Sequence, residues 1–268
     1  MRTLQLMAAC AAVAMLAPTT HAQDSQRDAS FKWTSGIETG RTVYVRNLNG
    51  GIHVEAATGA TAEVRAEKKW RRGDPKNVKI TAEKTARGDI LVCAIWEGHN
   101  TRCDEDGYNS HGGSWRDDDN NNDVSVEFTI QLPKGVQLEA STVNGGLDIA
   151  GATAAVTAHT VNGGIEAASN GGPVNAKTVN GGIRVRAGSM GTGPLSYETV
   201  NGSITLELPA DLNADIELRT VNGSVTSDDY PITIQGRIDR HRLNGKIGKG
   251  GPELRVSTVN GSIRLRKN

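Results

Sequence analysis

The 268-residue sequence balances 30 basic against 30 acidic residues, and only 4% of its residues are aromatic. With 32 glycines as well, it has too few bulky side chains to fill a large globular core. The small β-forming residues between the glycines favour a thin core of stacked strands.

Residues 1–22 have the layout of a secretory signal peptide. Arg2 gives a basic start, Leu4–Ala17 form an apolar stretch, and residues 20–22 (Thr-His-Ala) place small side chains before a cleavage site. The apolar stretch is too short for a transmembrane helix, and no later stretch reaches the roughly 18 apolar residues that are needed. We therefore expect an exported protein of the periplasm or cell surface, without a transmembrane segment.

Two cysteines remain after such processing, Cys93 and Cys103. In an oxidising compartment, an even number of cysteines separated by a short loop indicates a disulfide. The spacing therefore predicts one local bridge. It also argues against a zinc site made by these cysteines with His99 and His111, because their spacing matches no common zinc motif.

Residues 23–133 form the N-terminal β part of the expected fold. Alternation of apolar and polar residues predicts strands at Thr42–Leu48, Ile52–Glu55, Ala62–Trp70, Val78–Glu83, Ile90–Trp96 and Val124–Leu132. Arg71–Pro75 contains glycine and proline and predicts a turn. The Arg72-Gly73-Asp74 tripeptide within it is therefore expected to shape that turn rather than to act as an integrin-type recognition sequence.

Between the last two of these strands, residues 97–123 form a long acidic insertion without periodicity, with eight acidic and two basic residues. A loop of this length in a compact chain is usually functional or disordered. Its carboxylates offer the oxygen ligands that Ca²⁺ prefers, the candidates being Asp104, Asp106, Asp117, Asp118 and Asp119. The ordered spacing of known calcium loops is missing, so we expect a solvated loop and no cofactor.

Residues 134–268 repeat the tetrapeptide Thr-Val-Asn-Gly six times, and looser copies stand at Asn47–Gly50 and Arg242–Gly245. From Asn144 onward the asparagines follow one another at intervals of 16 to 22 residues, which is typical of a repeat protein. We expect the chain to bend at each copy, since Asn and Gly tolerate positive φ. The predicted corners are Asn49, Asn144, Asn162, Asn180, Asn201, Asn222, Asn244 and Asn260.

Two architectures fit such a bend, a series of hairpins and a solenoid. The residue before each asparagine would face outward in a hairpin and inward in a solenoid, and it is apolar in every later copy: Val143, Val161, Val179, Val200, Val221, Leu243 and Val259. We therefore favour an all-β fold, a single-stranded β-helix or solenoid of short coils with Asn-Gly corners, each coil stacked on the last. This interpretation predicts that Val179→Asp costs several kcal/mol, because it buries an unpaired charge.

The runs Phe128–Val143 and Gly250–Leu265, together with the Thr-Val-Asn-Gly copies, resemble the bacterial "putative adhesin" β-strand repeat proteins. That family is grouped with the toast-rack domains of envelope-stress systems, and the resemblance covers about Val43 to Leu265. It implies a single-stranded right-handed β-helix with a non-enzymatic role at the surface or in the periplasm. It supplies no catalytic or ligand-binding residues to carry over.

No nucleophile elbow, His-Glu metal pair or phosphate loop is visible in the sequence. We therefore expect an exported, non-enzymatic scaffold that binds a protein or glycan of the cell envelope or surface. Two alternatives stay open, a polysaccharide-active β-helix enzyme that uses Asp148, Asp211 and Asp215, and a Ca²⁺-binding envelope module. The basic residues near the C-terminus lack interleaved aromatic side chains, so no nucleic-acid partner is expected.

Overall fold

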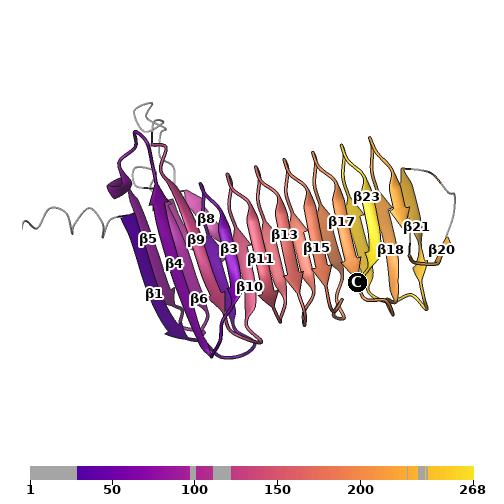
Figure 1. Ribbon diagram of the computed structural model, residues 1–268, viewed down its shortest axis with the longest axis horizontal. Helices are drawn as coiled ribbons and strands as arrows, with labels where there is room; N and C mark the ends of the chain where they lie inside the picture. Colours follow the sequence, from indigo (N-terminus) through magenta and orange to yellow (C-terminus); the bar gives the residue numbers. More distant parts are fainter. Residues whose placement is uncertain (1–28, 97–100, 111–121, 228, 235–238, 240) are drawn as a thin grey trace, which may run out of the picture.

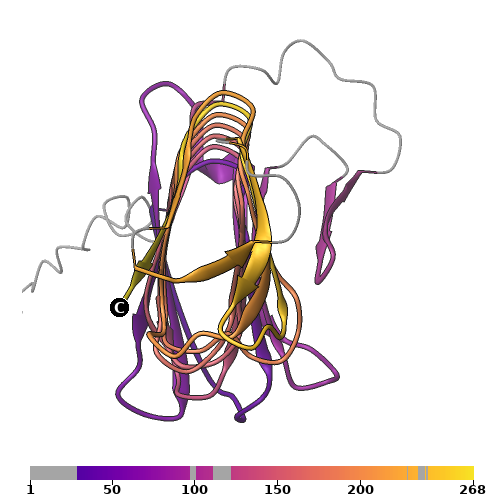
Figure 2. The same ribbon diagram turned by 90° about the vertical axis from the view of Figure 1, so that its right-hand side faces the viewer.

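The protein is an elongated stack of strands, seen from the side in Figure 1 and along its axis in Figure 2. The structure is a computed structural model that describes residues 29–96, 101–110, 122–227, 229–234, 239 and 241–268. The predicted signal peptide, residues 1–22, lies outside the described residues. Within the described ranges, no helix is long and apolar enough to span a membrane.

Two sheets face each other across a narrow interior. Sheet A contains, in spatial order, β1 (Ser30–Gly36), β4 (Thr61–Lys69), β9 (Ser125–Leu132), β3 (Ile52–Ala56), β11 (Leu147–Ala152), β13 (Ile165–Ser169), β15 (Ile183–Ala187), β17 (Ile204–Leu208), β23 (Ile263–Lys267) and β19 (Val225–Ser227). Sheet B contains, from the same end, β5 (Val78–Lys84), β6 (Ile90–Trp96), β2 (Thr42–Arg46), β10 (Gln137–Ser141), β12 (Val156–His159), β14 (Val174–Lys177), β16 (Leu195–Glu198), β22 (Glu253–Ser257), β18 (Ala214–Arg219), β21 (Arg242–Ile247) and β20 (Ile232–Ile234).

Each coil consists of one strand of sheet B, a corner, and one strand of sheet A. Neighbouring coils pair in parallel and in register, so that Ile165 lies beside Ile183, and Ile183 beside Ile204. These side chains point into the interior and are at most 2% exposed, and burying each contributes about 1.5–3 kcal/mol. The predicted all-β solenoid is confirmed.

The repeat had led us to expect coils stacked in sequence order, and the structure contradicts this expectation at two places. The last coil, β22–β23, lies between the coil of β16–β17 and the coil of β18–β19. The first coil, β2–β3, likewise lies between β6–β9 and β10–β11. Every copy of the repeat presents nearly the same surface to its neighbours, so the sequence pattern does not distinguish these positions.

The C-terminal end of the stack corrects one predicted corner. Asn244 lies inside β21, which runs antiparallel to β18, and it is paired with Glu217. The copy at residues 242–245 has Arg242 where six corners have a threonine and the Asn49 corner has Asn47, and this arginine is exposed. A long charged side chain cannot occupy the inward position of that threonine, so the chain continues as a strand.

Two further elements escaped the sequence analysis. The strand β1 pairs antiparallel with β4 at the N-terminal end of sheet A. Inside the acidic insertion, β7 (Thr101–Asp104) and β8 (Gly107–Ser110) form a two-stranded hairpin, although residues 97–123 had been expected to form an irregular loop. The rest of the insertion, residues 97–100 and 111–121, lies outside the described part of the chain.

Candidate functional site: the Asn-Gly corners, the groove beside them and the insertion hairpin

The corners between sheet B and sheet A are stacked along one edge of the solenoid (Figure 2), and seven asparagines pair with one another in a row at these corners. Their order in space is Asn49, Asn144, Asn162, Asn180, Asn201, Asn260 and Asn222. From Asn162 onward each side-chain amide donates to the oxygen of the preceding asparagine in the row over 2.7–2.8 Å, always in the same direction. At the other end of the row, Asn49 Nδ2 donates to the carbonyl of Val124 over 2.9 Å. We call this row the asparagine ladder.

The threonine two residues before each of six ladder asparagines points into the coil. Its hydroxyl donates to a glycine carbonyl of the neighbouring coil, as Thr160 Oγ1 does to Gly145 over 2.9 Å and Thr178 Oγ1 to Gly163 over 2.8 Å. These threonines are 1–5% exposed, and a buried hydroxyl needs such a partner. The threonine therefore ties each corner to the next.

The valine between threonine and asparagine points outward, which contradicts the predicted inward position. Val161, Val200 and Val259 are 38–39% exposed and Val221 is 59% exposed. Strand alternation explains the error, since the threonine continues the inward phase of the apolar residues before it and the valine falls on the opposite face. The solenoid was thus predicted correctly for a wrong reason.

In the six Thr-Val-Asn-Gly corners the first glycine is required by close packing and not by positive φ. A Cβ on Gly145, Gly163 or Gly181 would lie 2.0 Å from a carbonyl oxygen of the adjacent corner. The second glycine has room, since a Cβ on Gly164 would meet its nearest neighbour at 3.5 Å. This difference explains why serine replaces the second glycine, as in Ser203, and never the first.

A shallow groove of about 740 Å³ runs along sheet A beside the ladder. Its lining includes the second corner residue of successive coils, namely Gly51, Gly146, Gly164, Gly182 and Ser203. Because glycine has no side chain, this row leaves a hollow next to the first outward side chains of the sheet A strands. The groove therefore crosses the coils and presents the same positions once per coil, about 4.8 Å apart.

The charged side chains of the groove pair with one another. His53 Nδ1 lies 3.1 Å from Asp148 Oδ2, and its Nε2 lies 3.0 Å from Glu55 Oε1. In the next coils Arg184 Nη1 lies 3.9 Å from Glu166 Oε1. The groove is thus acidic toward β3 and basic toward β15, and its charged groups are exposed rather than held in a desolvated site.

The insertion hairpin packs on the outer face of sheet B. A disulfide joins Cys93 of β6 to Cys103 of β7, which confirms the predicted bridge and leaves neither sulfur for zinc. Tyr108 of β8 donates to the carbonyls of Ala94 and Arg46 over 2.6 and 2.8 Å, and burial raises the pKa of its phenol. The hairpin is therefore fixed to the solenoid at both of its strands.

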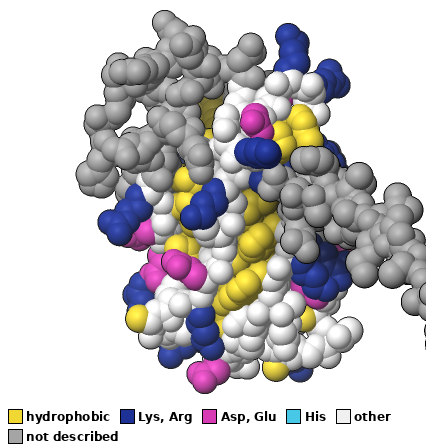
Figure 3. Space-filling model, turned by 90° about the vertical axis from the view of Figure 1, so that its left-hand side faces the viewer, with side chains coloured by type: hydrophobic (Ala, Val, Ile, Leu, Met, Phe, Trp, Pro, Cys, Tyr) yellow, Lys and Arg dark blue, Asp and Glu magenta, His cyan; other side chains and the backbone are white. Residues whose placement is uncertain are grey.

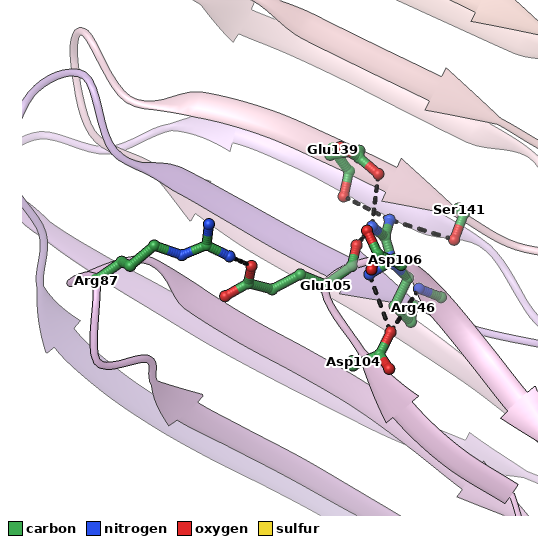
Figure 4. Close-up of polar contacts among 8 residues, drawn as sticks. Arg46, Arg87, Asp104, Glu105, Asp106, Glu139 and Ser141 are labelled. Atoms are coloured by element: carbon green, nitrogen blue, oxygen red, sulfur yellow. Dashed lines mark hydrogen bonds and ion pairs between the residues drawn. The ribbon is translucent and has the colours of Figure 1, made fainter.

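Arg46 lies beneath this hairpin with a side chain only 2% exposed. Its guanidinium pairs with Glu139 Oε1 at 2.5 Å and also donates to the Glu105 carbonyl, while Arg87 pairs with the Glu105 carboxylate (Figure 4). A buried charge is tolerated only when it is paired and hydrogen-bonded. The hairpin thus supplies part of the polar environment that Arg46 requires.

The candidate calcium ligands do not converge in the described residues. Asp104 Oδ1 accepts the backbone N–H groups of Asp106 and Gly107 at 3.0 and 3.1 Å, so it shapes the hairpin turn. Asp117, Asp118 and Asp119 lie outside the described residues. Where the structure describes the chain, no three His, Cys, Asp or Glu side chains are grouped as metal ligands would be.

Asp123, at the far end of the insertion, accepts hydrogen bonds from three successive backbone amides. The donors are Gly73 at 2.8 Å and Arg71 and Arg72 at 3.2 Å. These hydrogen bonds lower the pKa of the Asp123 carboxyl, and the one from Gly73 has the largest effect. The turn that contains the Arg-Gly-Asp tripeptide is thus closed by a carboxylate.

The acidic residues proposed for a polysaccharide-active enzyme are dispersed. Asp148 belongs to β11 of sheet A and lies beside His53. Asp215 belongs to β18 of sheet B, 3.6 Å from Lys246, and Asp211 precedes that strand. The two strands lie in different sheets and several coils apart, so Asp148 does not form with Asp215 the pair that glycoside hydrolysis uses.

The family model described as Toastrack DUF4097 matches residues 34–266. No curated protein matches the chain. Among solved structures, a "putative cell adhesion protein" from Clostridium sporogenes is 12% identical with a TM-score of 0.48, covering 89% of this chain and 100% of that one. A "putative adhesin" from Bacteroides fragilis is 6% identical with a TM-score of 0.27, covering 89% and 97%. Another from Parabacteroides merdae is 11% identical with a TM-score of 0.21, covering 90% and 96%.

Proposed function

Because the chain belongs to the Toastrack DUF4097 family, we propose that it is an exported, non-enzymatic scaffold of the cell envelope or cell surface. In this role it is adhesin-like, since it holds a partner and does not convert a substrate. Export is supported by the signal-peptide pattern of residues 1–22 and by the Cys93–Cys103 disulfide, a bond that persists in oxidising compartments.

The groove on sheet A is the observation that carries this proposal. It offers the same lining positions in successive coils, with glycine at Gly146, Gly164 and Gly182, and it is open along the axis of the solenoid. A site of this form suits an elongated partner, either an extended envelope glycan or a protein segment, whose repeating units follow the coils. A compact substrate would contact only one or two of these positions.

The arrangement of charge supports binding rather than catalysis. General acid–base catalysis needs groups that reach one reacting atom, with pKa values matched to their task. In the groove, His53, Asp148, Glu166 and Arg184 lie in a row along the surface and are paired with their neighbours. Such a row can select a partner by its charge pattern along the axis.

The test is a sedimentation assay in which the mature chain, residues 23–268, is mixed with purified peptidoglycan or with isolated envelope membranes. Gly164→Trp fills the groove and is expected to lower retention on whichever fraction binds the wild-type chain. Gly164→Ser is the matched control, because serine occupies the equivalent position at Ser203. Equal retention of both variants would remove the groove as the binding site, and absence of any retention would argue against the scaffold function.

A further inference from the structure

The two ends of the solenoid differ in how their sheets finish. At the C-terminal end the outermost strands, β19 and β20, have three residues each. At the N-terminal end the outermost strands, β1 and β5, have seven residues each, and no strand of the described chain pairs with their outer edges. Very short edge strands limit pairing with another molecule, whereas long regular ones offer a row of unpaired backbone groups.

The N-terminal end is also apolar between these two edges. Phe31 and Trp33 of β1 and Ile80 and Ala82 of β5 are partly buried and pack against the core. Figure 3 views this end directly and shows hydrophobic side chains in a strip between the charged residues of the two sheets. Many proteins protect an edge with inward-pointing charges, but the inward positions at the centre of these two strands are aromatic or aliphatic.

We propose that this end is the interface of a two-fold symmetric homodimer, in which β1 pairs with β1 and β5 with β5 of a second copy. Both strands run in the same direction, and Lys84 Nζ of β5 donates to the Gly36 carbonyl of β1 over 3.1 Å. The strand centres, Trp33 and Thr81, each lie three residues before these residues and therefore face each other. One two-fold axis normal to the sheets can pass through both centres and make both pairings antiparallel.

The sequence of β5 is self-complementary in this register. With Thr81 on the axis, Lys79 lies opposite Glu83 of the second copy, and the reciprocal pair forms by symmetry. Both side chains are exposed on the outer face in the single chain. On the inner face Ile80 lies opposite Ala82 of the second copy, which extends the apolar interior across the junction. Opposite charges at facing positions of antiparallel strands favour the pairing, and like charges oppose it.

The experiment measures self-association of the mature chain by sedimentation velocity over a wide range of concentration. Lys79→Glu places a second negative charge opposite Glu83 of the other copy, and this happens twice per dimer. We therefore expect the dimer dissociation constant to rise by roughly tenfold to thirtyfold at low salt. Glu83→Lys should act in the same direction. The double variant K79E/E83K restores opposite charges and should recover the wild-type constant. Lys249→Glu, in a turn at the opposite end, is the charge-matched control and should change nothing.

Three results would overturn the proposal. The first is a wild-type chain that stays monomeric at every concentration. This result would exclude the dimer whatever else covers the edges of β1 and β5. The second is a dimer whose dissociation constant is unchanged by Lys79→Glu. The third is a double variant that stays as weak as the single ones. Hydrogen exchange gives an independent check, since the amides of β1 and β5 should become protected only when the concentration favours the dimer.

Discussion

Two adjacent glycines in one corner should respond in opposite ways to the same substitution. A Cβ on Gly163 would lie 2.0 Å from the Gly145 carbonyl oxygen, whereas a Cβ on Gly164 would lie 3.5 Å from the Gly182 carbonyl oxygen. The first distance is more than 1 Å shorter than an ordinary carbon–oxygen contact of about 3.3–3.6 Å. Gly163→Ala must therefore move its corner away from the preceding coil, and Gly164→Ala need not.

The size of the effect follows from the hydrogen bonds that hold these two corners together. They are Gly145 N–H to the Asn162 carbonyl at 3.0 Å, Asn162 N–H to the Val143 carbonyl at 2.7 Å, Thr160 Oγ1 to the Gly145 carbonyl at 2.9 Å, and Asn162 Nδ2 to Asn144 Oδ1 at 2.8 Å. At about 0.5–1.5 kcal/mol each, their loss costs about 2–6 kcal/mol. Alanine returns about 0.4–1 kcal/mol by restricting the unfolded chain.

We therefore expect Gly163→Ala to lower the free energy of unfolding by about 1–5.6 kcal/mol, and Gly164→Ala to change it by less than about 1 kcal/mol. Urea unfolding followed by circular dichroism measures both, with Gly164→Ala as the internal control. If the two halves of the Gly163→Ala solenoid unfold in separate transitions, this also shows that the contact between the two corners has been weakened, because each coil contacts only its neighbours. Equal stability of the two variants would refute the close-packing explanation of the first glycine.

Three further predictions concern the valine, the hairpin and the closed turn. Val179→Asp should change the free energy of unfolding by less than about 1 kcal/mol because the Val179 side chain faces outward, whereas Val185→Asp, in the interior, should cost about 3 kcal/mol or more. Thermal unfolding measures both variants. Equal destabilisation would contradict the outward and inward positions assigned to the two valines. Replacing Cys93 and Cys103 with serine should speed hydrogen exchange in β7 and β8 and leave β10 to β15 unchanged; a global loss of protection would show that the hairpin is part of the core. Asp123→Asn should lower the unfolding midpoint at neutral pH. The folded-state pKa of Asp123 is depressed, so its contribution is present above the unfolded-state pKa and is lost as the pH falls through the folded-state pKa; a difference between variant and wild type that persists in acid would contradict this.

The repeat made the coil predictable because two of its four residues have a single structural role. The threonine is buried and hydrogen-bonded in the six Thr-Val-Asn-Gly corners, and the first glycine is the only residue that fits against the neighbouring backbone. The copy at residues 242–245 keeps the asparagine and glycine but has lost the threonine. The copy at Asn47–Gly50 forms a corner without threonine, because the buried amide of Asn47 donates to the carbonyls of Gly50 and Val126; a buried hydrogen-bonding side chain at this position thus accompanies every corner of the ladder.

Other features depend on contacts that local patterns do not contain. The strand β1 precedes the repeat and has only Phe31 and Trp33 as apolar members of its alternation. The hairpin of residues 101–110 is positioned by the Cys93–Cys103 disulfide and by the hydrogen bonds of Tyr108 to the carbonyls of Ala94 and Arg46, so periodicity gives no indication of it. The groove arises from stacking glycines of different coils, and it becomes visible only when the coils are placed side by side.

The insertion of the last coil between two earlier ones has a consequence for how the chain reaches its final form. Asn260 donates a hydrogen bond to Asn201 on one side and accepts one from Asn222 on the other, so a segment that follows both in sequence connects them. During synthesis or export from the N-terminus, the coils up to β17 can stack as they emerge. Among the described strands, β18 and β19 pair with the earlier coils only through β22 and β23, although Tyr230 also donates to the carbonyls of Leu208 and Pro209. A chain that ends before residue 253 would therefore lose not one coil but the strand pairing between the whole distal unit, β18 to β21, and the coils before it, and completion of both sheets waits for residues 253–268.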